Sequence, residues 1–233
     1  MNSHSYTHRR SQLEQYFDRT AAETWSRLTS DAPVSRIRAT VRAGREQMRD
    51  TLLEWLPASL HGIRLLDAGC GTGALATAAA LRGADVLAVD IAASLLDTAR
   101  ERLPTLSGGG RVEFLAGDML SPSHGRFDYV VAMDSLIHYQ APDVLAALAT
   151  LGERVNCGML FTFAPRTPLL AAMHAVGRLF PRGDRAPAIE PVGHARLLQE
   201  IVTHGGLRGW RVARTHRVAC GFYTSQALEL LRA

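Results

Sequence analysis

The stretch LLDAGCGTGALA, residues 65–76, has three glycines at alternate positions directly after a short apolar run. The apolar run predicts a buried strand, and the alanine-rich segment that follows predicts a helix. Gly69, Gly71 and Gly73 therefore lie in a predicted strand-to-helix turn, where glycine lets a ligand approach the backbone closely. The stretch predicts the first strand–turn–helix unit of a nucleotide-binding α/β fold.

The chain that follows alternates between predicted strands and predicted helices. Further strands are predicted at ADVLAVD (84–90), RVEFLAGD (111–118), FDYVVAMD (127–134) and GMLFTFA (158–164), with helices at 94–103 and 141–154. Two closing strands, 208–218 and 219–231, bring the total to seven, although the tail of the last one also fits a helix. This alternation predicts a doubly wound, mostly parallel, Rossmann-like sheet.

Residues 1–57 are predicted to form an N-terminal helical arm. Leu13, Tyr16 and Phe17 group on one face of its first amphipathic helix, and Pro33 opens a longer helix with apolar residues at helical spacing. The arm precedes the predicted α/β domain.

Residues 58–233 form the predicted α/β domain, and one segment interrupts its strand–helix rhythm. Residues 165–195 contain several prolines and follow the end of a predicted strand. Because α/β proteins bind ligands at the carboxyl ends of their strands, we expect this insertion to lie on the substrate side of the domain.

The composition excludes some classes of protein. The net charge is +4 and all 26 basic residues are arginine, a bias that fits either a GC-rich genome or carboxylate and phosphate ligands. The arginines are dispersed and aromatic residues make up 6% of the chain, which disfavours nucleic-acid binding. The three cysteines have no metal-site spacing and are expected to be reduced. With neither an apolar span nor a secretory signal visible, we expect a cytoplasmic protein.

Asp67 decides which nucleotide the glycine turn is expected to bind. GCGTGA also satisfies the dinucleotide pattern G-x-G-x-x-A, but Asp67 lies two residues before the first glycine. A carboxylate there would repel a pyrophosphate and attract the cationic amino acid end of S-adenosylmethionine (SAM). This disfavours a nicotinamide-dependent oxidoreductase.

DAGCGTG resembles the first motif of the class I SAM-dependent methyltransferases, and that family's later motifs follow in order. The resemblance implies that Asp90 accepts hydrogen bonds from both ribose hydroxyls, and that Asp118 of the pair Gly117-Asp118 accepts one from the adenine amine. Arg36 is expected to reach the cofactor carboxylate. The full predicted cofactor-binding set is Arg36, Asp67, Gly69, Cys70, Gly71, Gly73, Asp90, Ile91, Gly117, Asp118, Met119 and Met133.

From about residue 11 to its end, the chain resembles the magnesium-protoporphyrin IX O-methyltransferases of chlorophyll and bacteriochlorophyll biosynthesis. The resemblance is strongest in VAMDSLIHYQAPD, in LFPRGDRAPAI and in the N-terminal YFDRTAAETWSRLT. It implies a photosynthesis enzyme that esterifies one propionate of the macrocycle to give the monomethyl ester. It also implies substrate transfer from the large, porphyrin-binding subunit of magnesium chelatase, and at most peripheral contact with the photosynthetic membrane.

The insertion fits a flat apolar substrate that carries two carboxylates. Its apolar helical face is flanked by arginines, which suits an apolar cleft with a few cationic anchors. A propionate with a pKa of about 4.3 is already ionised at neutral pH, so no general base is needed, and the arginines are predicted to hold the propionate that does not react. The predicted substrate-binding set is Tyr139, Arg166, Met173, His174, Arg178 and Arg182.

The segment AMDSLIHYQAP, residues 132–142, places Asp134, Ser135 and His138 just after a predicted strand. His138 is the predicted catalytic residue, which either donates a hydrogen bond that aims a carboxylate oxygen or approaches the magnesium as an axial ligand. Two alternatives remain at this stage: a methyltransferase for another apolar molecule such as a quinone precursor, and a non-catalytic tetrapyrrole carrier.

Overall fold

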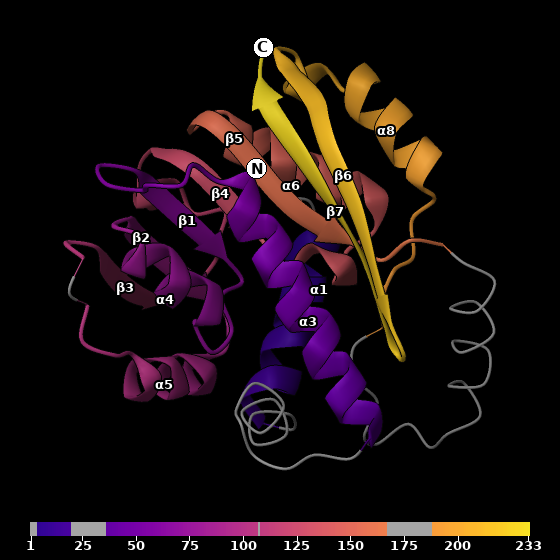
Figure 1. Cartoon of the computed structure of the whole chain (residues 1–233). Helices are drawn as coiled ribbons and strands as arrows, with labels where there is room; N and C mark the ends of the chain where they lie inside the picture. The colour runs from indigo at the N-terminus through magenta and orange to yellow at the C-terminus, as the bar shows by residue number, and fades with distance from the viewer. Residues whose placement is uncertain (1–3, 20–35, 107, 167–187) are drawn as a thin grey trace.

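The computed structural model describes residues 4–19, 36–106, 108–166 and 188–233 (Figure 1). The strands are β1 (Arg64–Ala68), β2 (Asp85–Asp90), β3 (Arg111–Ala116), β4 (Phe127–Ala132), β5 (Val155–Phe163), β6 (Trp210–Cys220) and β7 (Tyr223–Arg232). The α-helices are α1 (His4–Arg19), α3 (Arg36–Trp55), α4 (Ala74–Leu81), α5 (Ala93–Arg102), α6 (Ala141–Gly152) and α8 (His194–Thr203), and the 3₁₀ turns are η1 (Pro122–His124), η2 (Leu136–His138) and η4 (Gly205–Leu207). The predicted alternation of strands and helices is confirmed.

The seven strands form one sheet in the order β3-β2-β1-β4-β5-β7-β6. The first five are parallel, whereas β7 runs antiparallel to both β5 and β6. The strand order reverses between β1 and β4, and ligands of doubly wound sheets bind outside the carboxyl ends of the strands at such a switch point. The predicted Rossmann-like sheet is therefore confirmed, with its binding crevice at the ends of β1 and β4.

The sheet separates two apolar cores, because alternate residues of a strand face opposite sides. Leu66 and Val130 join the core under α6 and α8, whereas Leu65 and Val131 join the core under α3 and α4. Each fully buried leucine contributes about 1.5–3 kcal/mol, so both layers hold the sheet in place.

The same alternation explains why the end of the chain is a strand. β7 continues to Arg232, and the helical alternative for its tail is wrong. Leu228 and Leu230 face one core and Ala227 faces the other, which is a period of two. Pairing with β5 and β6 on both edges satisfies the backbone there.

Helix α3 packs across β6 and β7 through a glycine that contacts a tyrosine ring and through buried apolar side chains. A Cβ on Gly44 would lie 2.4 Å from Cδ1 of Tyr223, so only glycine allows this approach. Met48 and Leu52 are fully buried on the same face. The predicted domain boundary at residue 57 stays a prediction. Helix α3 lies before this boundary, yet it packs on the sheet in the same core as α4.

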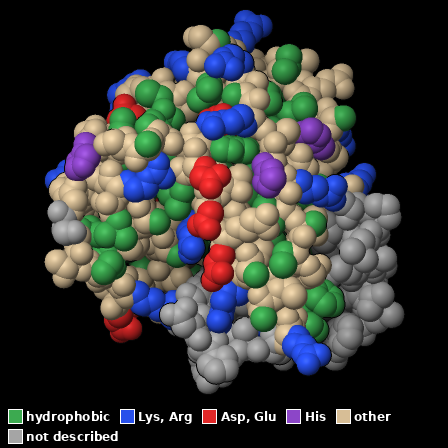
Figure 2. All heavy atoms as spheres, viewed as in Figure 1, with side chains coloured by type: hydrophobic (Ala, Val, Ile, Leu, Met, Phe, Trp, Pro, Cys, Tyr) green, Lys and Arg blue, Asp and Glu red, His purple; other side chains and the backbone are tan. Residues whose placement is uncertain are grey.

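The outward face of α3 is charged. Glu46, Asp50 and Glu54, spaced by four residues, are exposed, and Figure 2 shows acidic groups in a row down this face with arginines beside them. This is the polar side of an amphipathic helix. Among the helices that the structure describes, none combines the length and apolar character needed to cross a membrane.

Candidate active site

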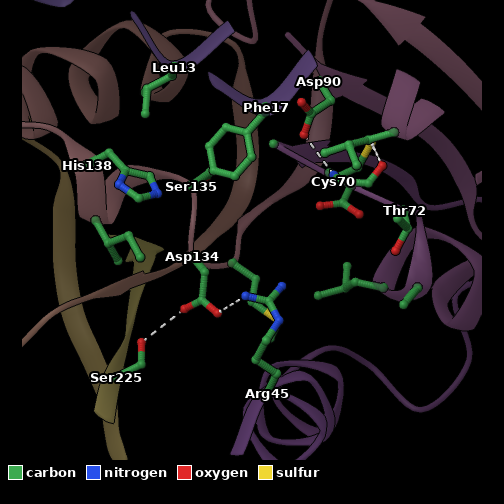
Figure 3. A pocket seen from close by; sticks show the side chains of 18 of the residues that line it. Leu13, Phe17, Arg45, Cys70, Thr72, Asp90, Asp134, Ser135, His138 and Ser225 are labelled. Carbon is green, nitrogen blue, oxygen red and sulfur yellow. Dashed lines mark hydrogen bonds and ion pairs between the residues drawn. The ribbon is translucent and has the colours of Figure 1, made fainter. Parts of the chain in front are cut away.

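A pocket of about 650 Å³ lies at the carboxyl ends of β1, β2 and β4, and residues of α1 and α3 form part of its wall (Figure 3). It lies at the switch point of the sheet. The predicted site residues that line it are Asp67, Gly69, Cys70, Gly71, Asp90, Ile91, Gly117, Met119, Met133, His138 and Tyr139. The structure therefore brings most of the predicted cofactor set and the predicted catalytic residue to one cavity.

The glycine turn has the backbone that the sequence predicts. Gly69, Gly71 and Gly73 have φ values of 85°, 53° and 74°, a region that other residues rarely adopt. A Cβ on Gly69 would lie 2.3 Å from Cβ of Ser135, whose hydroxyl donates to the Ala68 carbonyl at 2.7 Å. The turn after β1 and the segment after β4 are thus packed directly against each other.

The carboxylate of Asp90 is fixed by the backbone around it. Its two oxygens accept hydrogen bonds from the amides of Gly71, at 2.8 Å, and Ala92, at 2.9 Å. Ile91 and Met119 line the pocket nearby. A fixed acid between apolar side chains fits a ribose with an adjoining adenine.

Asp67 is 2% exposed, and its Oδ2 accepts a hydrogen bond from the amide of Ala76 at the start of α4, at 3.1 Å. Burial, and then the nearby charge of Asp90, raise the pKa of Asp67 to about 7. A bound cation would favour the ionised form, so this acid suits the amino group of SAM.

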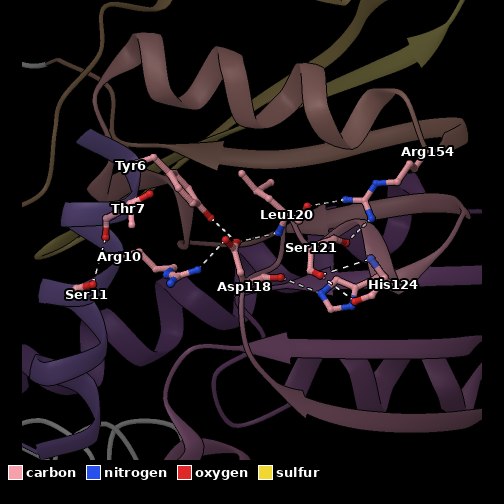
Figure 4. Close-up of polar contacts among 10 residues, drawn as sticks. Tyr6, Thr7, Arg10, Ser11, Asp118, Leu120, Ser121, His124 and Arg154 are labelled. Atoms are coloured by element: carbon pink, nitrogen blue, oxygen red, sulfur yellow. Dashed lines mark hydrogen bonds and ion pairs between the residues drawn. The ribbon is translucent and has the colours of Figure 1, made fainter. Parts of the chain in front are cut away.

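Asp118 does not line the pocket; it binds the N-terminal helix instead (Figure 4). Its Oδ1 accepts from the Tyr6 hydroxyl at 2.8 Å and from the Leu120 amide at 2.9 Å, and its Oδ2 accepts from Arg10 at 2.7 Å. This tether was not predicted from the sequence, because residue spacing does not reveal a contact between α1 and the end of β3. The adenine contact of Asp118 stays a prediction.

Two more residues of the predicted cofactor set lie outside the pocket wall. Gly73 is close-packed, since a Cβ there would lie 2.7 Å from the Phe114 ring. Arg36 is exposed at the start of α3, while Arg42, Arg45 and Arg49 of the same helix line the pocket. Their spacing of three and four residues was the sequence signal that could have identified this face.

His138 lies on η2 in the pocket wall, partly exposed. Its Nδ1 is 3.4 Å from the carbonyl oxygen of Ala188, which can only accept, so we assign the proton to Nδ1 and a lone pair to Nε2. The Phe17 ring lies edge-on at 5.9 Å between centroids. Burial lowers the pKa of His138 to about 4, so the imidazole is neutral at pH 7. This tautomer favours the axial-ligand interpretation over donation from Nε2.

The predicted substrate-binding residues are only partly described. Tyr139 stacks on Tyr6, with ring centroids 4.9 Å apart, and burial raises its pKa. The side chain of Arg166 is exposed, and its backbone amide donates to the carbonyl of Val192 at 3.0 Å. Met173, His174, Arg178 and Arg182 lie outside the described residues.

Asp134 forms a hydrogen-bonded centre at the end of β4. It has a φ of 54° without being glycine, and its side chain is 4% exposed. Its carboxylate accepts from Arg45 at 2.5 Å, from the Tyr223 hydroxyl at 3.1 Å, and from Ser225 and Thr162 at 3.2 Å each. Arg45, Tyr223 and Ser225 line the pocket, and none of the three was predicted there from the sequence.

Two family models match the chain. Residues 65–158 match a methyltransferase domain, and residues 132–232 match the C-terminal region of magnesium-protoporphyrin IX methyltransferase. Among solved structures, magnesium protoporphyrin IX methyltransferase from Synechocystis PCC 6803 with bound S-adenosylhomocysteine (SAH) matches with a TM-score of 0.83 and 29% identity, over 96% of this chain and 99% of that one.

Two curated relatives match over nearly their whole length. The magnesium-protoporphyrin O-methyltransferase of Rhodobacter capsulatus is 48% identical over 96% of this chain and 97% of its own. That of Synechocystis sp. (strain ATCC 27184 / PCC 6803 / Kazusa) is 30% identical over 95% of each chain.

The fold, the glycine turn with Asp67 and Asp90, and the domain match define a class I SAM-dependent methyltransferase. Within that class, the near full-length identity of 48% decides the family. The chain belongs to the magnesium-protoporphyrin O-methyltransferases, and the family expected from the sequence is confirmed.

Proposed function

We propose that this protein transfers the methyl group of SAM to a propionate carboxylate of magnesium-protoporphyrin IX, giving the monomethyl ester and SAH. The observation that carries the proposal is the 48% identity, over 96% of the chain, with the magnesium-protoporphyrin O-methyltransferase of Rhodobacter capsulatus. The pocket supports it independently, because one cavity holds a glycine turn, two acids suited to SAM and a histidine at the end of β4.

The proposed reaction is an in-line displacement at the sulfonium methyl. A propionate oxygen attacks the methyl carbon, and the sulfonium sulfur leaves with the bonding electron pair as the thioether of SAH. The propionate is ionised at neutral pH, so no proton has to be removed. Positioning and exclusion of water are left to supply most of the acceleration, and favourable orientation contributes about 7–11 kcal/mol in well-aligned reactions.

His138 suits this scheme as a neutral group that orients the substrate. With a pKa near 4 it carries no charge at pH 7, so it does not compete with the sulfonium for the propionate. Its Nε2 lone pair suits axial coordination of the magnesium in the substrate, which would fix the macrocycle in the pocket.

The assignments of single residues to the cofactor are part of the same proposal. Asp90 would accept from the ribose hydroxyls, Asp67 would face the amino group, and Met133 would back the methionine chain. All three line the pocket.

Two finer expectations also belong to this proposal. The first is that the large subunit of magnesium chelatase delivers the porphyrin directly, so that this apolar substrate does not have to diffuse through water. The second is peripheral contact with the photosynthetic membrane from a protein that otherwise works in the cytoplasm. Both rest on the family and on the apolar character of the substrate.

A mass-spectrometric assay tests the reaction. The purified protein is incubated with SAM and either magnesium-protoporphyrin IX or metal-free protoporphyrin IX. One added methyl group on the magnesium compound, with much less on the metal-free one, is the expected result. SAH binding without any methylated porphyrin would refute the substrate and favour another apolar acid or a quinone precursor.

A further inference from the structure

Helix α3 presents three arginines to the pocket, and one of them is tied into its wall. Arg42, Arg45 and Arg49 are spaced by three and four residues, so they share a face of the helix. Nη1 of Arg45 donates to Oδ2 of Asp134 at 2.5 Å, and the two side chains are only 20% and 4% exposed. This pair is therefore largely withdrawn from water inside the cavity wall (Figure 3).

The acceptor in this pair, Asp134, is also hydrogen-bonded to residues of β5 and β7. The Tyr223 hydroxyl and Ser225, both on β7, donate to Asp134, and the Asp134 amide donates to Thr162 on β5 at 2.7 Å. A left-handed backbone at a residue other than glycine costs folding free energy and persists only where its surroundings impose it. Such conformations cluster at functional sites, and this one lies in the pocket wall.

The arginines of the pocket lie apart from the acids of the glycine turn. Asp67 and Asp90 lie with that turn, whereas Arg42, Arg45 and Arg49 lie on α3. On this side the three arginines outnumber the two acids that also line the pocket, Glu46 and Asp134. The acids of the glycine turn suit the amino group and the ribose of the cofactor. The arginine face suits an anion, and a planar guanidinium can engage a carboxylate through a pair of N–H groups while a different N–H keeps its bond to Asp134.

We propose that Arg45 binds a ligand carboxylate in this pocket and that Asp134 is a positioning residue that fixes the guanidinium for it. The inference rests on the proposed function, because both proposed ligands carry carboxylates: the amino acid end of the cofactor and the propionates of the porphyrin. The held ion pair also keeps part of the arginine charge neutralised. This lets Arg45 orient a carboxylate without fully quenching it as a nucleophile.

The test compares each acid ligand with an analogue that lacks the carboxylate. Calorimetry measures binding of SAH and of 5′-methylthioadenosine, and fluorescence titration measures binding of magnesium-protoporphyrin IX and of its dimethyl ester. We expect Arg45→Met to weaken one acid ligand by about 10- to 100-fold, as for loss of a charge-assisted hydrogen bond, and its neutral analogue by less than about threefold. The weakened ligand identifies the source of the carboxylate.

Asp134→Asn tests the positioning role, because asparagine tolerates the left-handed backbone while it removes the charge and replaces one acceptor oxygen by an NH2 group. We expect a loss of about 3- to 10-fold for the same acid ligand, and no further loss when it is combined with Arg45→Met, as for two residues that act as one unit. Arg38→Met is the matched control, because Arg38 is exposed on α3 and does not line the pocket.

Two results would overturn the inference. Equal weakening of an acid ligand and its neutral analogue would make Arg45 a structural residue, and unchanged binding of all four ligands would remove it from recognition altogether. A wild-type protein that binds SAH but no porphyrin would refute the proposed substrate instead. The comparison of SAH with 5′-methylthioadenosine would then decide the role of Arg45 alone.

Discussion

The two ends of the pocket draw on the chain in different ways. At the glycine end, Asp67, the turn and Asp90 all come from residues 67–90, which form one strand–helix–strand unit. At the opposite end, Asp134 meets Arg45 from α3, Thr162 from β5, and Tyr223 and Ser225 from β7. The first end depends on one local geometry, whereas the second shares its hydrogen bonds among several partners. Single substitutions should therefore be more damaging at the glycine end.

Gly69→Ala should have the largest effect, because it disrupts the packing of the glycine turn against Ser135, next to Asp134. The new Cβ would have to adopt a φ of 85° and would collide with Ser135. We expect a loss of roughly 3 kcal/mol or more in the free energy of unfolding, with loss of SAH binding. Denaturant unfolding and calorimetry measure the two effects.

Gly62→Ala is the matched control for this change. Gly62 has a similar φ of 74°, but nothing lies within 4 Å of its added Cβ. It should lose only about 1 kcal/mol. Equal losses in the two variants would show that backbone strain, and not contact with Ser135, governs Gly69.

His138→Ala should lower kcat by about 100-fold, since misplacement of a reacting group costs that much. SAH affinity should change by less than about threefold, because the imidazole faces the substrate side in the proposal. His216→Ala, an exposed site on β6 outside the pocket wall, is the control. Unchanged turnover would remove His138 from the reaction.

The axial-ligand role of His138 has its own readout. If Nε2 coordinates the metal, His138→Ala should weaken binding of magnesium-protoporphyrin IX more than that of metal-free protoporphyrin IX. Because the pKa of His138 is lowered to about 4, its ionisation should leave no step in the pH profile between pH 6 and 8.

Asp67 makes cofactor binding depend on pH at the glycine end. Its pKa is raised to about 7, so binding a cationic amino group near neutral pH should release a proton. SAH affinity should rise by up to about tenfold per pH unit below pH 7 and level off above it. Calorimetry in buffers of different ionisation enthalpy measures the proton released, and Asp67→Asn should abolish both the slope and the release.

In the protein without ligand, the raised pKa of Asp67 makes stability fall as the pH rises, whereas SAH affinity rises with pH. Between about pH 4 and 7 the folded protein holds a proton on Asp67 that the unfolded chain loses. The resulting stability is lost as the pH rises through 7. Asp67→Asn, which keeps an oxygen for the Ala76 amide, should therefore gain stability relative to wild type as the pH rises from 5 to 8. An unchanged difference across this range would contradict the raised pKa.

Tyr223→Phe and Ser225→Ala should have the smallest effects. Each removes one donor to Asp134 and leaves the others in place. We expect a loss of about 1 kcal/mol in unfolding free energy for each, and a change of less than about threefold in kcat/KM. Thermal unfolding and steady-state kinetics measure these effects. A tenfold fall in kcat/KM from either substitution would show that the remaining donors do not hold Asp134 in place.

The parts of the site that the sequence predicted are those carried by neighbouring residues. The glycines, Asp67 and Asp90 occupy the turn and the strand end expected of them, because glycine conformation and strand period act over a few residues. Asp118 was also predicted in the cofactor set; its carboxylate contacts Tyr6 and Arg10, and its adenine contact stays a prediction.

The register of α3 shows why the arginine prediction named a residue outside the pocket. The helix itself was predictable from its apolar spacing, but the face that meets the pocket depends on how Gly44 and Met48 pack against β7. That packing turns Arg45 to the cavity and leaves Arg36 exposed at the start of the helix.

The sequence by itself determined the strand–turn–helix unit, the doubly wound order of elements and the acids of the glycine end, because local backbone preferences and periodic burial encode them. Only the tertiary structure decided that Arg45, Asp134 and Ser225 meet, that α1 binds Asp118, and that the Ala188 carbonyl lies 3.4 Å from Nδ1 of His138. Those contacts join residues far apart in the chain, and they exist only once the crossovers of the sheet have brought its strand ends and covering helices together.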